Sequence, residues 1–430
     1  MKKILFISPY FPPMGGSGVF RAQRLVKYLP EFGFQPLVVH FAGVPDQLED
    51  QSLVSELGAK FISYPVKFIE PSVRGIQGWL RERRGEPKSA KSPKIKTLER
   101  GFFLGLGAWM RDRVLIPDLA VTWIPLVLPV LDRLVAEHHP QAVFTTSSPE
   151  TSHLLGWHLK RKYGLPWIAD FRDPWTESVK VSTPIWPLRS LERYFERQTL
   201  LKADFVIAYS HGLADLLRQK VPADCHDKFI ICGPAVDTAK FDSIEPGAPK
   251  FDFLYTGYLD WLYPRELFFA LDSVNRRRKE KSQPLLQMGV AGRVGSMTQA
   301  FLEKFLGNGW LSLLGYLSHN QTLALLKSAR SLVLLHPDHK WWLPGKVAEY
   351  LYSGKPILAV INEGELKEIM KKFAHVLFLP NDRIELMQKL EKVFELAEEP
   401  RELPLEFSAL GQAEILADLF GKLINNHNRH

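Results

Sequence analysis

The order of apolar runs along the chain is the feature that most constrains its fold. Short runs typical of buried strands alternate with amphipathic stretches typical of helices, from KKILFIS near the start to DFVIAYS at residues 204–210. The alternation stops over residues 232–250, which are rich in proline, glycine and aspartate, and resumes at FDFLYTG. Strand, helix and strand at this spacing predict parallel sheets with helices on both faces. We therefore predict an α/β protein with two doubly wound domains facing a cleft.

These two series of strands and helices set the expected domain boundaries. The first domain is expected at residues 1–235 and the second at 236–405. A last amphipathic stretch, within 406–430, has no strand after it and is expected to pack back towards the first domain. Doubly wound sheets bind ligands outside the carboxyl ends of their strands, so the loops at those ends are where we look for a site.

Composition limits the compartment and the partners. Fifty-five lysine and arginine residues against 47 aspartate and glutamate residues give a net charge of +8, which favours anionic partners. Two cysteines in the whole chain are typical of a reducing compartment, so we expect a cytoplasmic protein. The longest apolar run, Leu119 to Leu131, contains Pro125 and Pro129 and is shorter than the roughly 20 residues that a membrane span needs. We therefore expect no membrane-spanning segment.

An insertion near residues 74–116 interrupts the first series. Arg74 to Arg100 holds nine basic residues against three acidic ones, and the aromatic stretch RGFFLGLGAWMRDRV follows. One interpretation is a solvated insertion with a partly packed helix. The other is an element that binds an anionic membrane surface, with aromatic side chains such as Phe102 and Trp109 in the interface. The second interpretation places the protein on the inner face of the cell membrane.

Several catalytic motifs are missing from the chain. It has no Walker-type phosphate loop, no H-E-x-x-H and no G-x-S-x-G, and Arg21 stands where a dinucleotide-binding G-x-G-x-x-G would need its third glycine. No Asp-x-Asp pair or His/Asp cluster has metal-ligand spacing at a strand end. We therefore expect no cofactor and metal-independent activity. No nucleic-acid recognition motif is present either, so nucleic acid is not an expected partner.

The loop after the first strand, SPYFPPMGGSGVF, is rich in glycine. Gly15, Gly16 and Gly18 allow a ligand to approach the backbone, and free amides at the start of the next helix favour an anion. After the PWIAD strand comes DFRDPW, which groups Asp170, Arg172 and Asp173. These charges either form a structural Asp–Arg pair with a helix cap, or hold a sugar or an acceptor hydroxyl.

The stretch HPDHKWWLPGKVAEYLYSGKPIL carries most information in the second domain. Gly345 and Lys346 stand where a helix should begin, so backbone amides and an ammonium group point to an anion site. Glu349 follows one turn later, and a carboxylate there can accept two hydrogen bonds from a vicinal diol such as ribose. The alternative is an exposed Lys346–Glu349 pair of little energetic weight.

Taken in this order, the motifs resemble those of a known family. The chain resembles the GT-B-fold glycosyltransferases, specifically the retaining glycosyltransferase family 4 (group 1 type) of bacterial polysaccharide and glycolipid assembly. The resemblance rests on SPYFPPMGGSG, GLPWIADFRDPW, CGPAVDTAKF, FLYTGYLD, LLGYLSHNQTLALLKSA and PGKVAEYLYSGKPIL. It implies two Rossmann-like domains, with a UDP- or GDP-sugar donor in the second and a lipid-linked or glycan acceptor in the first.

The resemblance also assigns residues to the donor site. It implies that the nucleotide-sugar is bound by Gly15, Gly16, Ser17, Gly257, Arg265, Gly315, Tyr316, Leu317, Gly345, Lys346 and Glu349. The glycine loops face the phosphates, residues 315–317 hold the base, and Glu349 holds the ribose. Lys346 and Arg265 neutralise the departing diphosphate.

The chain departs from the family pattern at two places. Trp342 stands where a second glutamate is common, and the histidine near the reaction centre of the first domain is replaced in DFRDPW, by Arg172 or Asp173. We take these two as the catalytic residues, acting in sugar transfer with retention of configuration. Two alternatives remain open: an inactive scaffold or partner subunit of the same fold, and a sugar-nucleotide epimerase of the same fold.

Overall fold

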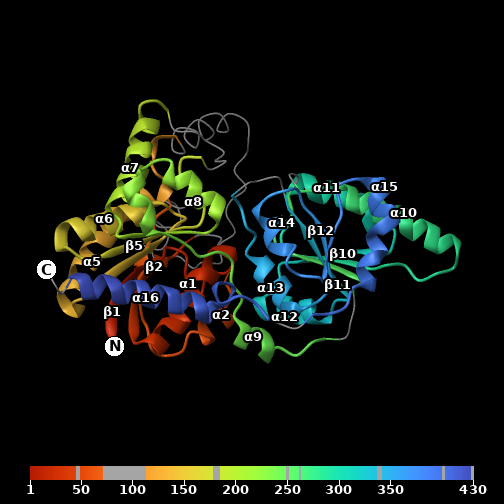
Figure 1. Ribbon diagram of the computed structural model, residues 1–430, viewed down its shortest axis with the longest axis horizontal. Helices are drawn as coiled ribbons and strands as arrows, with labels where there is room; N and C mark the ends of the chain where they lie inside the picture. Colours follow the sequence, from red (N-terminus) through yellow and green to blue (C-terminus); the bar gives the residue numbers. More distant parts are fainter. Residues whose placement is uncertain are drawn as a thin grey trace, which may run out of the picture. The chain divides into compact units, whose positions relative to one another are not determined.

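The computed structural model describes residues 1–44, 49–70, 113–177, 185–247, 251–260, 263–336, 341–399 and 402–427. These residues form two compact units (Figure 1). The first unit comprises Met1–Tyr209, Leu213–Cys232 and Ala413–His430, and the second comprises Ser210–Gly212 and Gly233–Gln412. The predicted basic insertion near 74–116 lies almost entirely outside the described residues.

A seven-stranded parallel sheet forms the centre of the first unit, in the order β3-β2-β1-β4-β5-β6-β7. The strands are β1 (Lys2–Ile7), β2 (Phe34–Ala42), β3 (Ile62–Lys67), β4 (Ala142–Thr146), β5 (Trp167–Phe171), β6 (Phe205–Ala208) and β7 (Phe229–Ile231). The strand order changes direction between β1 and β4. The loops that follow these two strands therefore lie at the topological switch point, where such sheets bind ligands.

Helices cover this sheet. They are α1 (Ser17–Tyr28), α2 (Ser52–Ser55), α5 (Ile124–His138), α6 (Thr151–Tyr163), α7 (Leu188–Lys202), α8 (His211–Arg218) and α16 (Ala409–His427), with 3₁₀ turns η1 (Leu29–Phe32), η2 (Leu119–Trp123) and η3 (Ala223–Lys228). The last helix, α16, lies along the first unit (Figure 1), where the ring of Phe420 is 5.4 Å from that of Phe34.

The apolar run at Leu119 corrects one sequence expectation. Helical structure continues through η2 and α5 from Leu119 to His138. Pro125 stands in the first turn of α5, where it does not interrupt the helix, and Pro129 lies inside α5. Among the described residues this is one helix of 20 residues, with a mean hydropathy of 1.7, long and apolar enough to cross a membrane. Core helices also pass this test, and the Trp123 indole donates a hydrogen bond to the Val66 carbonyl of β3.

A six-stranded parallel sheet forms the second unit, in the order β10-β9-β8-β11-β12-β13. Its strands are β8 (Phe253–Thr256), β9 (Met288–Ala291), β10 (Leu311–Gly315), β11 (Ser331–Leu335), β12 (Ile357–Val360) and β13 (Val376–Phe378). The direction changes between β8 and β11, so the loops after these strands occupy the switch point of this sheet. The predicted α/β class with two doubly wound domains is confirmed.

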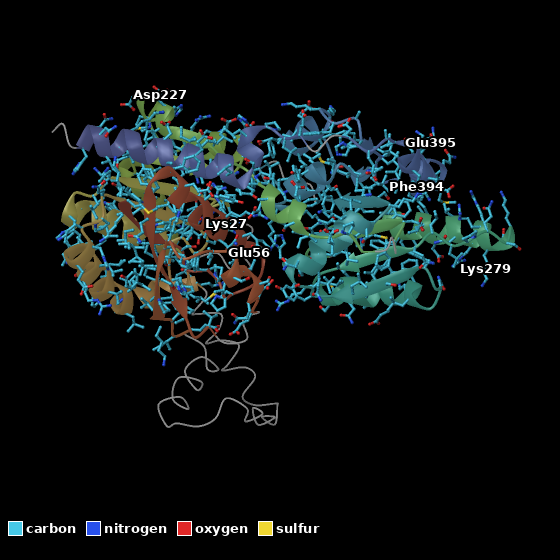
Figure 2. The ribbon with its side chains drawn as sticks, turned by 90° about the horizontal axis from the view of Figure 1, so that it is seen from below. Lys27, Glu56, Asp227, Lys279, Phe394 and Glu395 are labelled. Carbon is cyan, nitrogen blue, oxygen red and sulfur yellow. The ribbon has the colours of Figure 1, made fainter. Side chains whose placement is uncertain are left out.

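The helices of the second unit are α9 (Thr238–Ser243), α10 (Glu266–Glu280), α11 (Ser296–Leu306), α12 (His319–Ser328), α13 (Lys346–Ser353), α14 (Glu365–Met370) and α15 (Arg383–Lys389), with η4 (Leu390–Glu395) and η5 (Leu405–Phe407). The apolar faces of α10, α11 and α15 form one core with the sheet. The end of α10 is exposed, and Figure 2 shows Lys279 pointing away from this core.

Candidate functional site

The glycine loop after β1 leads directly into α1. Gly16 has a φ of 101°, in the left-handed region that glycine adopts without strain, and no side chain of the described residues caps the helix that begins at Ser17. Arg172, just after β5, donates a hydrogen bond of 2.7 Å from its Nη1 to the Gly18 carbonyl. The structure therefore brings the predicted DFRDPW segment and the predicted glycine loop together.

A buried ion pair stands beside this loop. Arg21 of α1 donates from Nη2 and Nε to the two oxygens of Asp170, at 2.8 and 2.9 Å, and Thr146 donates to the same carboxylate at 2.7 Å. Burial opposes the charged guanidinium, but the Asp170 carboxylate outweighs it and raises the pKa of Arg21 above its ordinary value. Asp170 is thus satisfied by the protein, in a structural Asp–Arg pair whose arginine is Arg21.

The two predicted catalytic residues differ in what they contact. Arg172 is partly buried and holds the glycine loop through Gly18. Asp173 is partly exposed and, within the described ranges, forms no hydrogen bond or ion pair. Of the two, Asp173 is therefore the side chain open to a ligand, and its catalytic role stays a prediction.

Sequence reasoning missed one histidine of the first unit, His153 on α6. Its ring stacks on Phe171 at 4.4 Å, and its Nδ1 lies within hydrogen-bond distance, 2.9 Å, of the Thr145 hydroxyl, which also accepts from the Trp167 indole. Burial lowers the pKa of His153 to about 3. The imidazole is therefore neutral near pH 7 and enclosed within the first unit. No spacing in the sequence signals this environment.

Three glycine-containing loops meet at the carboxyl edge of the second sheet. Gly257 follows β8 with a φ of 104°, and a Cβ on Gly292 would lie only 2.1 Å from the Gly257 carbonyl oxygen. The Gly292 amide in turn donates to the Gly315 carbonyl at 2.7 Å. These approaches place the predicted phosphate turn at Gly257 and the predicted base loop at 315–317 in one connected backbone layer.

Lys346 points into this layer from the start of α13. Its Nζ donates to the Thr256 carbonyl at 2.8 Å and lies 3.5 Å from the centre of the Tyr255 ring. The same atom is 3.9 Å from where a Cβ on Gly257 would stand. The residue as a whole is partly exposed, but protein atoms surround its ammonium group, and this burial lowers the pKa of Lys346 well below its ordinary value.

No carboxylate among the described residues pairs with the Lys346 ammonium. A buried cation without an anionic partner is costly, and an anion bound at Gly257 would supply that partner. The exposed Lys346–Glu349 pair that the sequence left open is not formed.

Glu349, one turn further along α13, is buried. It accepts a hydrogen bond of 3.0 Å from Nε2 of His319, whose Nδ1 is 2.8 Å from the ammonium of Lys240. His319 begins α12 immediately after the base loop and Ser318, which forms a capping box with Gln321. Glu349 is thus connected to the loop that the resemblance assigns to the base.

The remaining predicted donor-site residues are less enclosed. Tyr316 is exposed and Leu317 partly so, and Gly345 is exposed where α13 begins. Arg265 precedes α10, with its guanidinium 6.0 Å from the ring centre of Phe301. In the part of the chain that the structure describes, no group of three or more His, Cys, Asp or Glu side chains could hold a metal ion.

Comparison with known proteins finds one family domain in the first unit. Residues 15–225 match the model of the glycosyl transferase 4-like domain. No curated protein sequence is similar enough to count as a match.

Solved structures share the whole architecture at low sequence identity. A glycosyltransferase from Rickettsia africae is 15% identical, with a TM-score of 0.58 and coverage of 99% of each chain. The Anabaena protein HepE in complex with UDP and glucose is 12% identical, with a TM-score of 0.52, covering 100% of this chain and 99% of its own. A UDP-GlcNAc 2-epimerase from Neisseria meningitidis bound to UDP-GlcNAc is 11% identical, with a TM-score of 0.52, covering 98% of this chain and 100% of its own.

These likenesses establish the fold over the full length, and the domain match adds the activity class. Together with the two parallel sheets, they show that the chain has the two-domain fold of the GT-B glycosyltransferases, and the domain match over residues 15–225 supports glycosyltransferase activity.

Proposed function

We propose that the protein transfers a sugar from a nucleotide-sugar to a lipid-linked or glycan acceptor, with retention of configuration and without a metal ion. The observation that carries this proposal is the Lys346 ammonium, which is buried beside Gly257 and has no carboxylate partner among the residues that the structure describes. A diphosphate at this turn would give the ammonium its counter-charge. HepE in complex with UDP and glucose supports a UDP-sugar as the donor.

The chemistry of the transfer asks for such a cation. As the bond between the sugar and the diphosphate breaks, negative charge grows on the leaving phosphate oxygens. We assign the stabilisation of that charge to Lys346, to the positive end of the α13 dipole and to Arg265. Because the charge is greatest in the transition state, a cation there accelerates the reaction more than it tightens donor binding.

Binding of the nucleoside is assigned to Glu349, in the first turn of α13, and to the neighbouring base loop. We infer that Glu349 accepts hydrogen bonds from the ribose diol and that backbone groups of residues 315–317 bind the base. On the acceptor side, Asp173 is the carboxylate that we assign to the reaction centre, and Arg172 the group that holds the glycine loop for it. A lipid-linked or glycan acceptor places the reaction in polysaccharide or cell-envelope assembly, at the cytoplasmic side of the membrane.

Two variants test the donor site. Glu349→Ala is expected to weaken the binding of UDP and of a UDP-sugar alike, by the roughly 1.5–3 kcal/mol of hydrogen bonds to a charged group. Lys346→Ala is expected to lower turnover more than affinity, since its partner charge rises in the transition state. Calorimetry and turnover, with the exposed Lys279→Ala as control, measure both effects. Wild-type binding and turnover in both folded variants would refute the site.

An epimerase is the second candidate, because a UDP-GlcNAc 2-epimerase shares the fold over the full length. The two functions differ in their product. With a UDP-sugar and an acceptor extract, a transferase releases UDP and labels the acceptor, whereas an epimerase returns an isomeric sugar and needs no acceptor. Neither product, together with normal UDP binding, would favour an inactive scaffold, an alternative motivated by Trp342.

A further inference from the structure

Three buried side chains of the second unit form a continuous hydrogen-bonded chain. Lys240 comes from α9, His319 from the start of α12 and Glu349 from α13, and each residue is 7–8% exposed. The Lys240 Nζ lies 2.8 Å from His319 Nδ1, and His319 Nε2 lies 3.0 Å from Glu349 Oε1. Figure 1 shows α12 and α13 side by side, as these contacts require.

The chemistry of the three groups fixes the direction of both hydrogen bonds. A lysine ammonium can only donate, so Nδ1 of His319 accepts and the ring proton is carried by Nε2. That N–H then donates to the carboxylate of Glu349. The imidazole is thus a neutral spacer in a single tautomer, with a positive group on one side and a negative group on the other.

Lys240 itself is held firmly against α13. Its own backbone amide donates to the Asp237 side chain that caps α9. On the next residues of α9, the Phe241 ring meets Tyr352 at 5.3 Å, and the Tyr352 hydroxyl donates to Asp242 at 2.7 Å. Tyr352 belongs to α13, the helix of Glu349. Both ends of the chain are therefore fixed to the same helix, and its middle is fixed to the base loop.

Burying these charged side chains does not by itself stabilise the fold. Two charges removed from water lose solvation, and apolar residues of similar volume commonly fill such positions at least as well. What the chain provides is orientation: it directs one oxygen of Glu349 to His319 and so restricts how the other can be presented.

We propose that Lys240 and His319 are positioning residues that hold the Glu349 carboxylate for the ribose diol and thereby make the donor site selective for ribose over deoxyribose. This inference rests on the proposed function, because it takes Glu349 as the ribose-binding group. It extends that function to two residues that need not touch the donor, and it links ribose recognition to the loop that binds the base.

The experiment compares the affinities for UDP and 2′-deoxy-UDP by calorimetry, since only UDP offers both hydroxyls of the diol. The wild-type protein is expected to prefer UDP by about tenfold, the effect of one hydrogen bond to a charged group. His319→Phe, which cannot donate to Glu349, and Lys240→Met, which cannot fix the tautomer, should each bring this ratio close to one. His319→Gln restores a donor and should retain part of the preference.

Lys327→Met is the matched control. Lys327 donates from α12 to the carbonyls of Asp242 and Ile244 at the end of α9, but it is not part of the hydrogen-bonded chain of Lys240, His319 and Glu349. Its loss should leave the ratio of affinities at the wild-type value even if thermal stability falls. A structural role for His319 would lower stability in the same way without changing the ratio.

The possible failures are distinguishable. If Glu349→Ala abolishes the preference for UDP but folded His319→Phe and Lys240→Met retain it, the positioning role is wrong and the proposed donor site stands. If Glu349→Ala binds both nucleotides like the wild type, the donor site itself is wrong. A wild-type protein that binds neither nucleotide, or both equally, overturns the inference. Should His319→Phe not fold, Lys240→Met gives the same comparison.

Discussion

Replacing Lys346 by methionine should make the protein more stable and less active. Methionine keeps the unbranched shape of the side chain, is one atom shorter, and removes its charge. In the wild type, the ammonium has lost its water and gains one hydrogen bond to the Thr256 carbonyl and a position 3.5 Å from the Tyr255 ring centre. Burial of an ion costs several kcal/mol of solvation free energy. The hydrogen bond recovers about 1.5 kcal/mol of this cost, and the cation–π contact with Tyr255 recovers about 2 kcal/mol. We therefore expect Lys346→Met to gain about 1 kcal/mol near neutral pH.

The pH dependence gives this prediction a second test. Burial lowers the pKa of Lys346 in the folded protein well below the value of about 10.4 that it has when unfolded. Between those two values the unfolded chain binds more protons, so wild-type stability rises with pH. The penalty is fully present below the folded pKa and disappears above the unfolded one. The advantage of Lys346→Met should therefore shrink as the pH is raised towards about 10.4.

Urea unfolding of both proteins across this pH range measures the stability, with hydrogen exchange of β8 and α13 peptides to locate the effect. Turnover with a UDP-sugar should fall by about a hundredfold, the usual effect of removing one group that stabilises transition-state charge. A variant that is clearly less stable than the wild type near neutral pH would refute the burial argument. A variant with normal turnover would refute the role in catalysis.

Three other predictions concern the rest of the chain. Asp170→Asn, which leaves Arg21 buried beside a neutral group, should lower the free energy of unfolding by about 3–5 kcal/mol in urea titrations, and a smaller loss would mean that water reaches the pair. Turnover should survive excess EDTA; a loss that magnesium or manganese restores would contradict the metal-independent mechanism. The protein should co-sediment with anionic liposomes at low salt, and less of it should do so at high salt or after removal of Arg81, Arg83 and Arg84. A protein that stays in solution under all these conditions would exclude a membrane role for the basic insertion.

The alternation of strands and helices was readable from the sequence because it depends on local periodicity. The run PWIAD predicted β5, which forms over Trp167–Phe171, and PILAVI predicted β12, which forms over Ile357–Val360. Proline was a less reliable signal: Pro125 and Pro129 indicated an interrupted apolar run, but helical structure continues through both. A proline in the first turn loses no hydrogen bond, so the pattern alone overstated the interruption.

The partners of charged residues could not be predicted in the same way. Asp170 pairs with Arg21, far from it in sequence, although Arg172 is the nearer arginine along the chain. Glu349 contacts His319 and not Lys346, which stands one turn away on the same helix. Such choices depend on which loops the sheet order brings together and on which side chains point inwards. Residue spacing along one helix or loop contains neither fact.

The two units differ in how a buried cation is balanced. This difference distinguishes a structural arginine from a lysine suited to bind a ligand. In the first unit the Arg21 guanidinium meets a carboxylate that also accepts from Thr146, so the protein itself completes the pair. In the second unit the Lys346 ammonium meets a carbonyl and an aromatic ring, which stabilise a cation but do not neutralise it. The Lys346 ammonium is therefore already in place to attract an anion bound at Gly257, and the surrounding side chains would need little rearrangement. The second sheet, not the first, is where we expect the diphosphate to bind.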